Sequence, residues 1–124
     1  MSLERTLELE SIELRKLQTE YSKLIENHQK LTSQFQENEL VQKEFNLLND
    51  NAKIFKLIGP VLVPQDKEEA TLNVEKRIEY IKEELNRVDQ RIKELTNLQE
   101  TKSSEVYKLQ TQFQQKLELE KSKS

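Results

Sequence analysis

The chain has 124 residues, of which 34% are hydrophobic and 35% are charged, and its formal net charge is −3. Globular domains usually contain about 25% charged residues, so this composition excludes a compact core of ordinary size and favours long, narrowly buried helices. The 20 basic and 23 acidic residues are interleaved, without the basic patch of a nucleic-acid-binding protein, so we expect no nucleic-acid partner. There is no cysteine, which excludes disulfides and thiolate metal sites, and we expect no metal and no cofactor.

Membrane and secretory segments are also not predicted. The longest apolar stretch lies between Leu57 and Val63, far below the about 20 residues that a membrane helix needs, so we expect no membrane partner. The beginning of the chain carries several glutamates against Arg5 alone. That acidic start argues against a secretory signal and against a basic DNA-reading arm.

The first predicted element is a helix over about residues 3–50. Its apolar and aromatic side chains alternate in the three-and-four spacing of a heptad seam, which is typical of a coiled coil. The seam contains Leu3, Leu7, Leu14, Leu17, Tyr21, Leu24, His28, Leu31, Phe35 and Phe45, with Glu10 and Asn38 at two further seam positions. Near Val41 the apolar pattern shifts by one residue, which predicts a local irregularity.

A β-hairpin is predicted next, over about residues 53–64. This segment is rich in β-branched and aromatic residues, and Gly59-Pro60 divides it into two short runs, as in two strands joined by a turn. Pro64 follows the second run. Because proline cannot donate a ladder hydrogen bond, we expect the second strand to end at Val63.

A second helix is predicted over about residues 66–121, with Asp66 and Glu69 as a capping pair at its start. Its seam is more regular than the first, with interruptions at Gln99 and Lys102. The apolar seam residues are Val74, Ile78, Ile81, Leu85, Val88, Ile92, Leu95, Val106, Leu109 and Phe113. The fold class is therefore all-α dominated: residues 1–124 are expected to form one module, an antiparallel two-helix coiled-coil hairpin whose helices are joined by one short β-hairpin.

The predicted β-hairpin is the feature that suggests assembly. A lone two-stranded hairpin is marginal in water, and its free edges invite pairing with another chain. We therefore predict that its apolar residues complete a sheet with other subunits: Ile54, Phe55, Leu57, Ile58, Val61, Leu62 and Val63. The alternative is that the hairpin packs only on the ends of its own helices.

The run from Phe55 to Val63 resembles the hairpin of β-class prefoldin subunits. The flanking segments Gln36-Glu37-Asn38 and Lys76-Arg77-Ile78-Glu79-Tyr80-Ile81 resemble the helix ends next to that hairpin. The specific resemblance covers about residues 31–85, and the outer parts of the helices match only in heptad character and length.

This resemblance implies a specific assembly and activity. Prefoldin is a hexamer of two α-class and four β-class subunits, in which the hairpins form β-barrels and six coiled coils extend from them. The single hairpin here implies the β class. The implied partners are other α- and β-class prefoldin subunits, unfolded client proteins of the actin and tubulin type, and the cytosolic chaperonin. The implied role is that of a cytoplasmic, ATP-independent, non-enzymatic co-chaperone subunit.

In this family, client contacts lie toward the free ends of the coiled coils. The candidate client-binding tip residues are Leu3, Leu7, Leu9, Ile12, Val106, Leu109, Phe113, Leu117 and Leu119. Leu9, Leu117 and Leu119 lie off the strict seam, where they would present apolar surface outward. The alternative for the seam members of this set is that they only close the coiled coil.

Catalysis is not indicated. The single glycine excludes a glycine-rich phosphate loop, and two helices offer no cleft for a catalytic set. His28, without cysteine partners, is interpreted as a structural seam residue, and Tyr21, Tyr80 and Tyr107 are interpreted as packing residues. The alternative function is a structural coiled-coil adaptor or tether that oligomerises through the hairpin.

Overall fold

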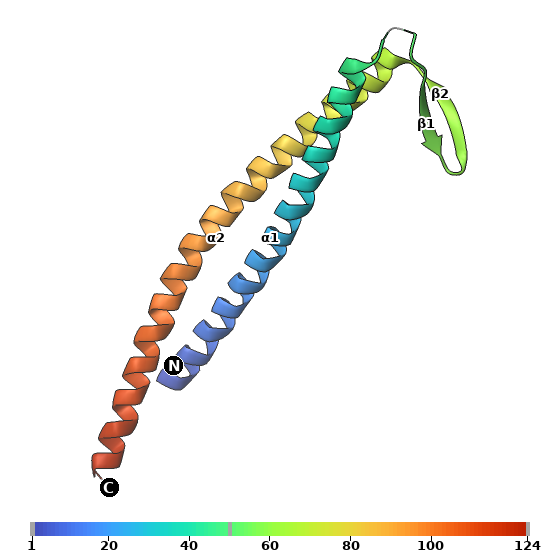
Figure 1. Ribbon diagram of the computed structural model, residues 1–124. Helices are drawn as coiled ribbons and strands as arrows, with labels where there is room; N and C mark the ends of the chain where they lie inside the picture. The colour runs from blue at the N-terminus through green and yellow to red at the C-terminus, as the bar shows by residue number, and fades with distance from the viewer. Residues whose placement is uncertain (1, 50, 124) are drawn as a thin grey trace. The chain divides into compact units, whose positions relative to one another are not determined.

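The computed structural model describes residues 2–49 and 51–123. The chain forms α1 (Leu3–Leu47), β1 (Ile54–Ile58), β2 (Val61–Gln65) and α2 (Lys67–Lys123), in that order (Figure 1). The predicted fold class, two long helices joined by a short β-hairpin, is confirmed. The chain divides into two compact units, one of residues 2–26 with 89–123 and one of residues 27–88.

Local hydrogen bonds set the ends of α1. Ser2 caps the helix, because its side-chain Oγ accepts a hydrogen bond from the backbone N–H of Arg5 at 3.1 Å. The helix ends at Leu47, where Asn49 forms a turn by accepting a hydrogen bond from the N–H of Asn51 at 3.1 Å through its Oδ1 atom. The predicted end at residue 50 lies outside the described residues.

The two strands are joined by the two-residue turn Gly59-Pro60. Gly59 has a φ of 58°, and the proline ring holds φ of Pro60 negative. Glycine at the first central position followed by a negative φ is typical of a type II′ turn, whose twist matches that of the strands. The pairing runs antiparallel from Ile58 opposite Val61 to Ile54 opposite Gln65.

The expectation that the second strand ends at Val63 is wrong. Strand β2 continues through Pro64 to Gln65, and Pro64 lies opposite Phe55. In an antiparallel pair, hydrogen-bonded and non-hydrogen-bonded positions alternate, and the residues beside a two-residue turn form a hydrogen-bonded pair. Counting from Ile58 and Val61, Pro64 falls at a non-hydrogen-bonded position, so its missing N–H costs the hairpin nothing.

Helix α2 begins immediately after β2. Its first turn carries Glu68 and Glu69 and its last turn carries Lys121 and Lys123, both favourable to the helix dipole. The Nζ atom of Lys67 donates a hydrogen bond to the backbone carbonyl of Leu48 at 2.9 Å. This bond satisfies a carbonyl just past the end of α1 and connects it to the start of α2.

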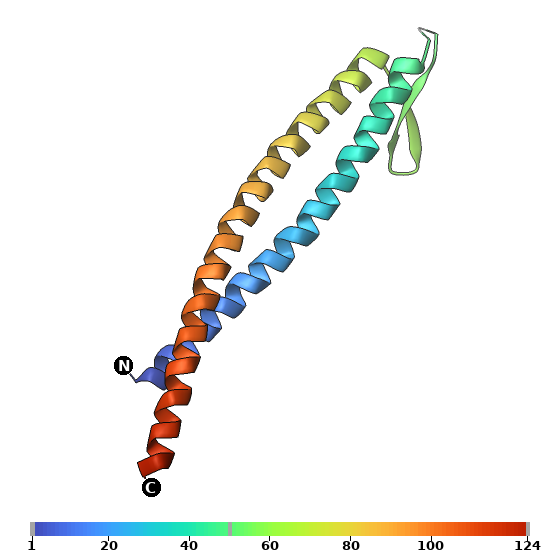
Figure 2. The ribbon, with the colours of Figure 1, turned by 60° about the vertical axis from the view of Figure 1, so that its left-hand side comes forward.

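Within the unit of residues 27–88, the two helices lie side by side and bury the predicted seam (Figures 1 and 2). The buried apolar residues there are Leu31, Ala70, Val74, Ile78, Ile81 and Val88. Asn38 is buried among them, and its side-chain amide donates to the carbonyl of Gln34 in the same helix at 2.7 Å. The polar seam residue is therefore satisfied within α1.

Within the unit of residues 2–26 and 89–123, the buried seam contains Leu95 and Val106. Leu95 is 0% exposed, the most completely buried side chain of those described. The neighbouring Leu98 of α2 is 47% exposed. This contrast is what a narrow seam on a long helix produces, since only one stripe of each helix is covered.

We predict that Leu95→Ala lowers the free energy of unfolding by about 2–5 kcal/mol, because it removes a buried side chain and leaves a cavity. The matched control is Leu98→Ala, which should change it by less than about 0.5–1 kcal/mol. Urea unfolding followed by circular dichroism at the helix band measures both. Equal destabilisation by the two variants would contradict the seam assignment.

Candidate functional site

One face of the hairpin is entirely apolar and exposed. The cross-strand pairs Phe55–Pro64 and Leu57–Leu62 lie on this face, because side chains alternate between the two faces of a strand. Leu57 is 67% exposed and Leu62 is 63% exposed. We call Phe55, Leu57, Leu62 and Pro64 the apolar face of the hairpin. Exposed apolar surface of this kind marks sites of interaction.

The opposite face of the hairpin is mixed in character. It carries Ile54, Lys56, Ile58, Val61, Val63 and Gln65. Ile54 and Gln65, at its base, are half-buried, and they line a cavity of about 230 Å³ together with Val41 and Phe45 of α1 and Val74 of α2. The base of the hairpin therefore packs on its own helices, while the rest of both strands remains exposed.

The structure brings all seven predicted assembly residues into this one hairpin. Six of them are exposed, and Ile54 alone is half-buried. The alternative, that the hairpin packs only on the ends of its own helices, agrees with the half-buried Ile54. It does not account for the exposed apolar face.

Sequence reasoning missed exposed leucines on the helices near the hairpin. Leu40 and Leu47 of α1 are 59% and 86% exposed, and Leu72 of α2 is 48% exposed. All three lie off the heptad seam. Leucine outside a heptad seam is the sequence signal that would have identified them.

The predicted client-binding tip residues divide into two groups. Val106 is buried, and Leu3, Leu7, Leu9, Leu109 and Phe113 are half-buried. Three are exposed: Ile12, Leu117 and Leu119. While the helices stay paired, only the exposed group offers apolar surface without rearrangement.

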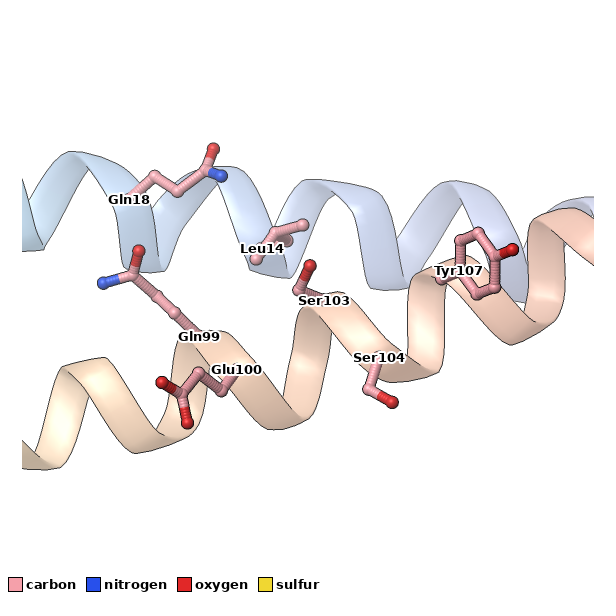
Figure 3. Close-up of a pocket in the computed structure, with 7 residues that line it drawn as sticks. All are labelled: Leu14, Gln18, Gln99, Glu100, Ser103, Ser104 and Tyr107. Carbon is pink, nitrogen blue, oxygen red and sulfur yellow. The ribbon is translucent and has the colours of Figure 1, made fainter.

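A shallow groove of about 560 Å³ lies between the helices in the unit of residues 2–26 and 89–123. It is lined by Leu14 and Gln18 of α1 and by Gln99, Glu100, Ser103, Ser104 and Tyr107 of α2. Figure 3 shows Gln99 and Ser103 pointing toward α1, Gln99 on the side of Gln18 and Ser103 on the side of Leu14. Most of the residues that line the groove are polar in type, and Gln99 interrupts the seam here.

Two of the three tyrosines are not packing residues. Tyr80 is 61% exposed and Tyr107 is 70% exposed, so that interpretation is wrong for both. Tyr21 is half-buried, as expected for its seam position.

One polar interruption of the first seam, Glu10, pairs with one of the second seam, Lys102. The Nζ atom of Lys102 donates to Glu10 Oε2 at 2.7 Å, across the helices. This hydrogen bond is the main cause that lowers the pKa of Glu10 below its ordinary value, and it raises the pKa of Lys102. The two charged residues therefore stabilise each other at neutral pH and fix which parts of α1 and α2 are adjacent.

A second cross-helix ion pair lies in the same unit. Arg91 donates to Glu20 of α1 at 2.9 Å and to Glu94 of its own helix at 3.0 Å. The hydrogen bonds to Glu94 and then to Glu20 raise the pKa of Arg91. Exposed pairs of this kind contribute little to stability, but they add specificity to the helix pairing.

No group of histidine and acidic side chains among residues 2–49 and 51–123 is arranged to hold a metal ion. In the same part of the chain, no helix has the length and apolarity needed to cross a membrane.

The fold, two paired helices joined by an exposed β-hairpin, defines a class of coiled-coil proteins. Comparison with known proteins shows which family within that class applies. The family model described as "Prefoldin subunit" matches residues 10–119. The chain therefore belongs to the prefoldin family.

Individual relatives agree with this assignment. The chain is 46% identical over 112 residues to prefoldin subunit 6 of Arabidopsis thaliana, covering 90% of this chain and 87% of that protein. It is 36% identical to prefoldin subunit 6 of Homo sapiens over the same shares of the two chains. The crystal structure of the prefoldin beta subunit from Thermococcus strain KS-1 has a similar fold, with a TM-score of 0.74, 20% identity, and coverage of 82% of this chain and 89% of that one.

We predict that Glu10→Gln lowers the stability of the coiled coil at neutral pH and that this difference disappears in acid. The pKa of Glu10 is depressed below its ordinary value in the folded chain, so its stabilisation is present above that ordinary value and is lost as pH falls through the folded pKa. Urea unfolding midpoints taken in steps from neutral pH down through the acid range measure the difference. The control is Glu13→Gln, whose ion pair with Lys16 stays within one helix. A pH-independent effect of Glu10→Gln would contradict this role of the carboxylate.

Proposed function

We propose that this chain is a β-class subunit of a hexameric, cytoplasmic prefoldin co-chaperone. In this proposal the complex captures unfolded proteins of the actin and tubulin type and delivers them to the cytosolic chaperonin without using ATP. The hairpin assembles the subunit into the complex, and the helix ends farthest in sequence from the hairpin contact the client.

The observation that carries this proposal is the exposed apolar face of the hairpin. Leucines that are about two-thirds exposed, as Leu57 and Leu62 are, are unfavourable on a chain that acts alone. Covering them with another subunit contributes about 1–2 kcal/mol each at their present exposure. Membership of a family whose relatives are named as subunits supports the same conclusion.

Client holding is proposed for the exposed tip leucines. Leu117 and Leu119, together with Ile12, offer apolar side chains to a chain that has not buried its own. Each contact is weak, but several coiled coils that hold one client raise its effective concentration at every other site. No nucleotide is needed for binding of this kind, because the interaction is apolar and reversible.

The opposing possibility is a tether that oligomerises through the hairpin and holds no client. The co-chaperone subunit and the tether differ in the stoichiometry of their complexes and in whether they bind a client. A hetero-hexamer that suppresses aggregation of denatured actin supports the proposal. A stable homodimer without that activity would favour the tether.

We predict that the double variant Leu57→Asp with Leu62→Asp weakens incorporation into the complex by at least about 100-fold, because it places two charges where apolar surface must be covered. Native mass spectrometry after co-expression with the other prefoldin subunits measures incorporation. The control is Leu98→Asp, an exposed leucine remote from the hairpin in sequence. Normal incorporation of the hairpin variant would remove the basis of the proposed assembly.

We predict that Leu117→Ser with Leu119→Ser leaves the hexamer intact but raises the concentration needed to suppress actin aggregation about two- to tenfold, since apolar contacts with the client are lost. Light scattering of diluted denatured actin measures the activity. Leu98→Ser is the matched control. If the control weakens client holding as much as the tip variant does, the tip assignment fails.

A further inference from the structure

The apolar seam is interrupted in the unit of residues 2–26 and 89–123. On α2, the buried seam residues Leu95 and Val106 are about 16 Å apart along the helix, and the seam positions between them are Gln99 and Lys102. Leu14 of α1 faces this stretch, where it lines the shallow groove together with polar residues of α2 (Figure 3). Apolar packing around Leu95 therefore does not extend continuously to Val106.

Beyond this interruption lies a short paired section. Counted outward from the pair Glu10–Lys102 in the antiparallel direction, residues 3–9 of α1 lie alongside residues 103–109 of α2. We call these two ranges the end section. Its four apolar seam residues are Leu3, Leu7, Val106 and Leu109. All except Val106 are only half-buried, and about two turns of each helix are marginal without further support.

The Glu10–Lys102 ion pair lies at the boundary between the interruption and the end section. Lys102 Nζ is 2.7 Å from Glu10 Oε2 across the helices and 3.6 Å from Glu105 Oε2 on its own helix. The side chains of Lys102 and Glu10 are 26% and 27% exposed, whereas those of Arg91 and Glu20 are 41% and 44% exposed. Because water screens a less exposed pair less, the Glu10–Lys102 pair is the stronger of the two cross-helix pairs.

We infer that the Glu10–Lys102 ion pair is a latch, which keeps the end section closed while it is formed and lets that section open separately when it breaks. Opening exposes apolar side chains that the closed helices cover, including the buried Val106. The consequence for the client rests on the proposed function: the latch regulates how much apolar surface the end of the coiled coil offers. Glu10 and Lys102 act here as positioning residues and not as client contacts.

The chemistry of the pair suits a section that opens. Apolar residues that replace a shielded ion pair are often neutral or stabilising, so leucine at both positions would continue the seam and close the end section more firmly. Separated charges are solvated by water, whereas separated leucines are not. The charged pair therefore specifies the closed arrangement while keeping the cost of opening low.

Spin-label distances across the helices test the latch directly. The chain has no cysteine, so two introduced cysteines are labelled uniquely before assembly with the other prefoldin subunits. Glu4→Cys with Lys108→Cys places labels at exposed positions opposite each other in the end section. Thr19→Cys with Lys93→Cys provides an inner pair at exposed positions on the other side of the interruption. Pulsed electron paramagnetic resonance on the assembled complex measures both distances.

Lys102→Glu places like charges opposite each other and should move the outer label pair to longer and broader distances while leaving the inner pair unchanged. Exchanging the charges, with Glu10→Lys added to Lys102→Glu, should restore the closed distance. The matched control is Arg91→Glu, which breaks the other cross-helix pair beside the buried Leu95 and should leave the outer distance unchanged. An unchanged outer distance in Lys102→Glu, or equal opening in Arg91→Glu, would overturn the inference.

A permanently closed variant tests the consequence for the client. Glu10→Leu with Lys102→Leu should keep the outer labels close and leave the complex assembled. It should raise the concentration needed to suppress aggregation of denatured actin about two- to tenfold, because the covered apolar side chains stay covered. Lys102→Glu should need no higher concentration than wild type. Client holding by the leucine variant equal to that of wild type would overturn the regulatory role.

Failure of the latch is distinguishable from failure of the proposed function, because the label distances are measured without a client. If the wild-type complex does not suppress actin aggregation, the proposed function is wrong, and the latch is judged from the distances alone. If the wild-type complex holds actin while Lys102→Glu leaves the outer distance unchanged, the proposed function stands and only the latch is wrong.

Discussion

A two-stranded sheet can satisfy only the backbone groups that its strands direct toward each other, and this constraint governs how the chain can associate with other chains. In the hairpin of residues 54–65, every second residue directs its N–H and C=O outward. Water can solvate those groups, but the same residues carry apolar side chains that water does not favour. Another strand satisfies both requirements at once, because it pairs with the outward groups and covers the side chains.

The helices impose a different constraint. A long two-helix coiled coil buries only one stripe of each helix, so its stability is distributed along the seam rather than concentrated in one core. Leu95 and Val106 are buried in one unit, and a longer run of residues is buried in the other. Glu10 and Lys102 interrupt the seams and weaken apolar packing, yet their ion pair makes the wrong helix register costly, since a shift would separate the two charges.

Much of this architecture could be predicted from the sequence because periodic signals are strong. The heptad spacing identified the seam that contains Leu95, and the clustering of Gly59 and Pro60 located the turn. The effect of Pro64 was misjudged because a proline in a strand costs a hydrogen bond only at a hydrogen-bonded position. Which kind of position Pro64 occupies is known only from the strand register. Tyr80 and Tyr107 were misjudged although the heptad spacing indicates exposure, because each lies off the seam, beside the seam residues Ile81 and Val106.

The pairing of Glu10 with Lys102 is not apparent when each helix is considered alone. In its own helix, each residue is a charged side chain that interrupts an apolar seam. Only the antiparallel alignment of the helices shows that the two faults coincide and compensate each other. The same reasoning applies to the hairpin, where Lys56 and Pro64 appear as departures from an apolar β sequence. Placed in register, Lys56 lies opposite Val63, and Pro64 lies opposite Phe55 at a non-hydrogen-bonded position, where its missing N–H removes no bond from the hairpin. In both places, the residue opposite in the partner element, and not the neighbours in sequence, determines whether an irregular residue disrupts the structure.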